Sequence, residues 1–77
     1  MPPTTTKIGD TMQNLLDVLF EIEFHKANND KSSARKHRAA LIKETRKLIN
    51  ELDNAKIGDL AGVDLINNAT DLINWMS

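Results

Sequence analysis

The chain of 77 residues has no cysteine, two prolines, three glycines and an aromatic content of only 4%. Without cysteine, neither a disulfide framework nor a thiolate metal site can form, so stability must come from packing or from association with other chains. No apolar run approaches the ~18 residues needed to cross a bilayer, and the first residues lack the pattern of a secretory signal. We therefore expect one small domain in the cytoplasm, on the nucleoid or in a virion, without a membrane partner.

The sequence also lacks the residue groupings that enzymes use. His25 and His37 are expected on different helices, and the serines fall at expected helix caps or near the last residue. No nucleophile with an adjacent base can be assembled from them. Neither histidine belongs to a pair with metal-ligand spacing and a third ligand, since Glu21 and His25 at i,i+4 can simply stabilise a helix. We predict no catalytic residue, no metal, no cofactor and no small-molecule substrate.

The hydrophobic periodicity predicts an all-α fold, because alternating β-branched runs and hairpin dipeptides are missing. Residues 1–8, with two prolines and three threonines, are expected to form a flexible arm. Residues 9–77 should form a single helical domain with helices at about 10–27, 30–55 and 60–75. Connections this short favour antiparallel neighbours in a three-helix bundle.

Particular residues mark the expected helix ends. Asp10 with Gln13 makes a plausible capping box for the first helix. Gly58 suits the end of the second helix, and Asp59 suits the N-cap of the third. The tetrapeptide Lys-Ile-Gly-Asp occurs at both 7–10 and 56–59. A match of four residues is too short to indicate duplication, so two independent uses of the same cap chemistry are favoured.

The first helix carries more apolar surface than one partner helix can cover, which predicts a homo-oligomer, most simply a symmetric dimer. Its apolar residues are Met12, Leu15, Leu16, Val18, Leu19, Phe20, Ile22 and Phe24. Trp75 near the end of the third helix can pack at the core edge, which we favour, or anchor a partner surface. The predicted oligomer interface consists of Leu15, Leu19, Phe20, Phe24 and Trp75.

Charge is strongly segregated along the chain although the net charge is −1. Residues 28–52 contain seven of the ten Lys and Arg residues. Residues 9–30 and 48–77 each contain five acids and a single lysine. On a helix, one arc of the basic stretch carries Arg35, Lys36, Lys43, Arg46 and Lys47. A second arc is apolar and is expected to be buried; it consists of Ala34, Leu41, Ile42, Thr45, Leu48, Ile49 and Leu52. Arg38 alone falls inside the apolar arc, where its aliphatic stem can cover the core edge.

The basic arc supports two interpretations. Charged side chains often do no more than solvate the outer face of an amphipathic helix. Alternatively, several Lys and Arg residues on one face can neutralise duplex phosphates. No aromatic residues interleave with the charges, and few side chains are suited to reading bases, so we predict contacts to double-stranded DNA without sequence specificity. The predicted nucleic-acid-binding residues are Lys31, Arg35, Lys36, Lys43, Arg46 and Lys47.

Residues 29–48, NDKSSARKHRAALIKETRKL, resemble the basic, alanine-rich helix of the bacterial histone-like proteins related to the chlamydial histone H1-like protein. The resemblance extends over residues 12–52, and its matching positions are Lys31, Ala34, Arg35, Arg38, Leu41 and Lys47. It implies a helical hairpin that organises DNA and self-associates, although the lysine- and alanine-rich tail of the family is absent here.

Two function hypotheses follow from the charge pattern. The first is a small histone-like protein that contacts the duplex backbone through the basic helix. The second is a structural or assembly protein, such as a virion component or an adaptor, in which acidic strips of one subunit meet the basic strip of the next. The two hypotheses divide on whether protein covers the basic face.

Overall fold

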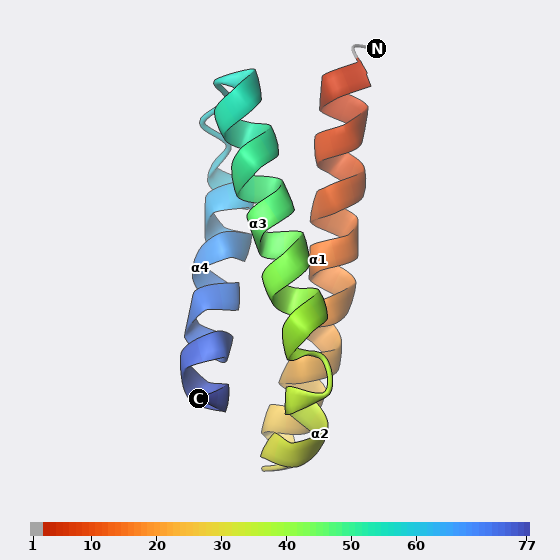
Figure 1. Ribbon diagram of the computed structural model, residues 1–77, viewed down its shortest axis with the longest axis vertical. Coiled ribbons are helices and arrows are strands. Elements are labelled where there is room, and N and C mark those ends of the chain that lie inside the picture. The colour runs from red at the N-terminus through yellow and green to blue at the C-terminus, as the bar shows by residue number, and fades with distance from the viewer. Residues whose placement is uncertain (1–2) are drawn as a thin grey trace.

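A computed structural model describes the backbone of residues 3–77 and the side chains of residues 7–77. Every regular element in this part of the chain is a helix: α1 (Pro3–Ala27), α2 (Lys31–Arg35), α3 (Arg38–Ala55) and α4 (Leu60–Met76). Helix α3 runs antiparallel to α1 and α4, and the short α2 lies at one end of the bundle (Figure 1). The molecule is a rod with extents of 40 × 18 × 18 Å. The predicted all-α bundle is confirmed.

Helix α1 begins at Pro3, well before the predicted start at Asp10. Proline is tolerated in the first turn of a helix because the amides there have no intrahelical acceptor. Ile8 in the added turns is buried in the bundle, as is Thr11 just beyond them, whose hydroxyl donates to Glu51 Oε1 of α3. The predicted helix start and capping box at Asp10 are therefore wrong, and residues 3–8 of the predicted arm are helical. Residues 1 and 2 of that arm lie outside the described residues.

The second predicted helix is divided into α2 and α3 by a turn at Lys36 and His37. The amide of Lys36 donates to the Ser33 carbonyl over 3.2 Å, and that of His37 donates to the Ala34 carbonyl over 3.0 Å. This is the tight i→i+3 pattern that often ends a helix. No proline or glycine marks the break, so tertiary packing of α2 against α1 and α4 decides it.

The α3–α4 connection follows the prediction at one end only. Lys56, with φ 55°, takes the left-handed position at the end of α3 that was expected of Gly58. Asp59 caps α4 as predicted, accepting from the Ala61 amide over 3.0 Å. The third helix agrees with its predicted span to within one residue. Gly62 is buried at the start of α4, where an added Cβ would lie 3.0 Å from Leu52 Cδ1.

The core is a single apolar column between the three long helices. Leu15 and Leu19 of α1 belong to it, with exposed fractions of 0% and 4%, so they are not available to a partner subunit. Their assignment to the oligomer interface is wrong, because α3 and α4 of the same chain already cover them. No helix in residues 3–77 is long and apolar enough to cross a membrane. The buried apolar residues are Ile8, Leu15, Leu19, Ile22, Ala34, Leu41, Leu48, Leu52, Ala69, Leu72 and Met76.

Candidate nucleic-acid interface

A basic surface runs along the outer side of α3. Its four cationic side chains are all exposed, and with Ala39, Ile42 and Asn50 they line an open surface hollow of about 720 Å³. The lining residues form two neighbouring rows at i+4 spacing, 38–42–46–50 and 39–43–47. At 1.5 Å per residue these rows extend over about 18 Å. We call Arg38, Lys43, Arg46 and Lys47 the α3 basic surface.

Two of the three acids of α3, Glu44 and Glu51, lie on a different side of the helix, and the third, Asp53, is exposed beyond the end of the α3 basic surface. Glu44 and Glu51 are only half-exposed, and each buries one carboxylate oxygen that has no hydrogen-bond partner among the described residues. Glu51 places its other oxygen against the Thr11 hydroxyl of α1. These two carboxylates thus belong to the packed side of the helix. The α3 basic surface carries four positive charges without an acid among its lining residues.

The other three predicted phosphate ligands lie on α2 or at its end, beside α4. Arg35 Nε donates to the Met76 carbonyl over 2.8 Å, which satisfies an orphan acceptor at the C-terminus of α4. The Lys31 ammonium lies 5.5 Å from the centre of the Trp75 ring, within cation–π range. Lys36 is exposed at the C-cap of α2. The structure therefore brings together Lys43, Arg46 and Lys47 and separates them from this second group.

Sequence reasoning missed Arg38 as part of the basic surface. The predicted apolar arc included Ile42 and Ile49 and therefore also Arg38, but Ile42 is half-buried and Ile49 is 45% exposed. In the structure Arg38 opens α3 after the turn at His37, and its side chain is exposed. A usable signal was present, because Arg38, Ile42 and Arg46 follow one another at i+4 spacing along one row.

Two phenylalanines make an apolar surface on α1. Phe20 and Phe24 lie one turn apart with exposed fractions of 65% and 64%. These are the members of the predicted oligomer interface that remain accessible. Trp75 is half-buried and packs against the core, as its favoured interpretation held. The ammonium groups of Lys26 and Lys31 lie over its ring at 5.7 and 5.5 Å.

A second apolar surface lies at the α3–α4 connection, and the sequence did not indicate it. Leu60 is 82% exposed and Ile57 is 42% exposed. Ile49, which the predicted apolar arc included, is 45% exposed, and Val63 is 43% exposed; both line a hollow beside the connection. These side chains stay uncovered because none of the described helices packs across this end of the rod.

The likeness of residues 12–52 to histone-like proteins stays a prediction. Comparison of the chain with protein-family models, with curated proteins and with solved structures gives no match.

Proposed function

We propose that this protein binds the phosphate backbone of duplex nucleic acid through the α3 basic surface. The observation that carries the proposal is the exposure of Arg38, Lys43, Arg46 and Lys47 in two adjacent rows, with Glu44 and Glu51 turned to the packed side of the helix. Lys and Arg side chains in such an arrangement neutralise phosphates and release counterions. The resemblance of this stretch to histone-like proteins supports the same function.

The composition of the surface favours binding without sequence specificity. Bidentate recognition of bases relies on Arg, Asn and Gln side chains that enter a groove. Here Arg38 and Arg46 share one row with Asn50, but Ile42 separates the two arginines. A rod about 18 Å across is also wider than the ~12 Å major groove, so we place α3 along the backbone.

Salt dependence tests the proposal quantitatively. Four phosphate contacts predict that log K falls with log salt with a slope near −4. Replacing Lys43 and Lys47 by Gln should reduce the slope to about −2, while Gln preserves helix propensity. Fluorescence anisotropy with a labelled duplex at several salt concentrations measures both slopes. Two unrelated duplex sequences should give the same affinity.

The matched control replaces Lys7 and Lys26 by Gln. Both residues are exposed on α1, so the control has the same net charge as the Lys43 and Lys47 variant but an intact α3 basic surface. It should keep a slope near −4. Equal slopes for the two double variants would refute the assignment to α3, and absence of duplex binding even at ~50 mM salt would refute the function.

Self-association is the second candidate function, and the exposure of Phe20 and Phe24 favours it. Two large apolar side chains one helical turn apart can pair with the same patch on a second copy around a two-fold axis. Changing both to Ser should abolish a dimer seen by analytical ultracentrifugation without unfolding the chain, since neither side chain is in the core. A monomer at micromolar concentration would contradict this function and leave nucleic-acid binding untouched.

A further inference from the structure

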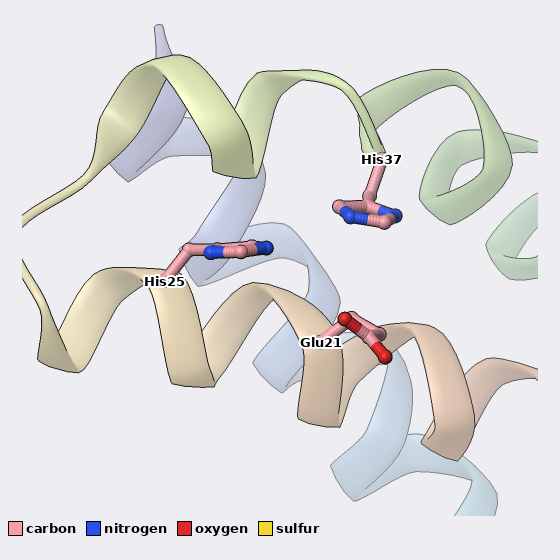
Figure 2. Close-up of side chains that lie close together, drawn as sticks. All are labelled: Glu21, His25 and His37. Atoms are coloured by element: carbon pink, nitrogen blue, oxygen red, sulfur yellow. The ribbon is translucent and has the colours of Figure 1, made fainter.

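Two histidines and a glutamate meet where α1 passes the turn between α2 and α3. Glu21 and His25 lie one turn apart on α1, and His37 approaches them from the turn (Figure 2). One ligand atom from each residue lies within 4.8 Å of the others. The two imidazole rings are stacked, with centroids 5.5 Å apart and planes at 17°. Residues far apart in sequence thus present two nitrogens and a carboxylate to a common space.

The helix break at Lys36 and His37 creates this meeting. Helix α2 ends at Arg35, and His37 is the N-cap of α3 with φ −100° and ψ 1°. Its side chain makes no capping hydrogen bond, although the N-cap position normally uses a side chain in that way. The imidazole is instead directed towards α1, where it stacks on His25.

We propose that Glu21, His25 and His37 bind a divalent zinc ion. Imidazole nitrogen and carboxylate oxygen are ordinary Zn²⁺ ligands, and three protein ligands leave a fourth position for water. Calcium and magnesium prefer sites built mainly from oxygen, which two imidazoles do not provide. Neither helix alone supplies three ligands, since Glu21 and His25 lie on α1 and the third ligand, His37, comes from the turn before α3.

The side chains can reach the required geometry without rearranging the core. Ligand atoms around a tetrahedral zinc ion are about 3.4 Å apart when each lies ~2.0–2.2 Å from the metal. The cluster must therefore contract by up to about 1.4 Å, and one ring must turn so that both nitrogen lone pairs face the ion. Glu21 is exposed and both histidines are half-buried. Rotation of an imidazole about χ2 is soft, because this torsion has broad minima.

A bound ion would fasten the α2–α3 turn to α1. Backbone hydrogen bonds and packing hold this turn, and neither a proline nor a side-chain cap reinforces it. Binding to the folded chain alone raises its stability by mass action. The site uses none of the residues of the α3 basic surface, so zinc binding and nucleic-acid binding can be tested separately.

Isothermal titration of the full, tag-free chain with zinc chloride tests the site. We expect one ion per chain and a higher thermal midpoint in the presence of zinc. The imidazole NMR signals of both histidines should shift together. Glu21→Gln and His37→Ala should each weaken zinc binding by more than about tenfold. A loss of about tenfold is what removal of a hydrogen-bond partner of a metal ligand costs, and loss of the ligand itself should cost more. The control Glu23→Gln changes a neighbouring exposed acid of α1 and should leave affinity unchanged.

Three results would overturn the assignment. They are the absence of zinc binding, equal affinity of His37→Ala and the unchanged chain, and one ion shared by two chains. Circular dichroism shows whether His37→Ala keeps its helices. If it does not, the exposed Glu21→Gln variant decides, because its side chain contributes nothing to the core. Retained zinc affinity in folded Glu21→Gln would then refute the three-ligand site.

Discussion

Replacing Gly9 by Ala tests the extension of α1 towards Pro3. The structure places Gly9 inside a helix that began six residues earlier, whereas the sequence placed it just before the first cap. A Cβ built on Gly9 meets no atom within 4 Å, so the new methyl group causes no clash. Any change in stability must therefore come from the backbone.

The expected gain is about 0.8–1 kcal/mol, the difference between Gly and Ala in a helix interior. Part of it arises because Ala has less conformational freedom than Gly in the unfolded chain. A domain of this size should show a rise of roughly 4–8 °C in the thermal midpoint for 1 kcal/mol. If α1 began at Asp10 instead, Gly9 would sit outside the helix and most of the gain would vanish.

Urea unfolding followed by circular dichroism at 222 nm measures the difference, with the m-value as a check that the same surface unfolds. Gly58→Ala is the matched control, since Gly58 also has open space around it but lies in the α3–α4 connection. Its effect should be a small fraction of that of Gly9→Ala. Equal midpoints for Gly9→Ala and the unchanged chain would refute a helix that runs through residue 9.

Two further predictions concern the core and the α2 cap. Leu48→Ala should cost about 2–5 kcal/mol because the side chain is fully buried, whereas Ile49→Ala, 45% exposed, should cost much less; urea midpoints compare them. Asp30 is the N-cap of α2, and its side chain accepts a hydrogen bond from the Ser33 amide over 3.0 Å. Hydrogen bonds from the Ser33 hydroxyl and amide, helped by the charges of His25 and Lys36, lower the pKa of Asp30. Its carboxylate therefore stabilises the fold above the ordinary pKa of about 3.9, and this contribution is lost as the pH falls through the lowered folded value. Asp30→Asn should remove that part of the acid dependence of the thermal midpoint. An unchanged dependence would show that the capping hydrogen bonds do not stabilise the charged carboxylate.

The all-helical type of the fold and its three long helices could be read from the sequence because each depends on local chemistry. Asp59 caps α4 through an amide two residues away, so its role needs no knowledge of the rest of the fold. The 3.6-residue period likewise identified Leu41, Leu48 and Leu52 as core residues, since one helix face must be buried whatever covers it. The concentration of positive charge in residues 28–52 is a property of composition alone.

Helix limits and the meeting of distant side chains required the tertiary structure. Helix α1 starts ahead of Asp10 because Ile8 is buried in the bundle, a gain that no local signal records. No proline or glycine in the sequence marks the break at His37. The break determines that His37 reaches His25. Periodicity fixes which residues share a face of one helix. The angle at which the chain turns between two helices depends instead on packing between elements, and that angle decides which side chains meet.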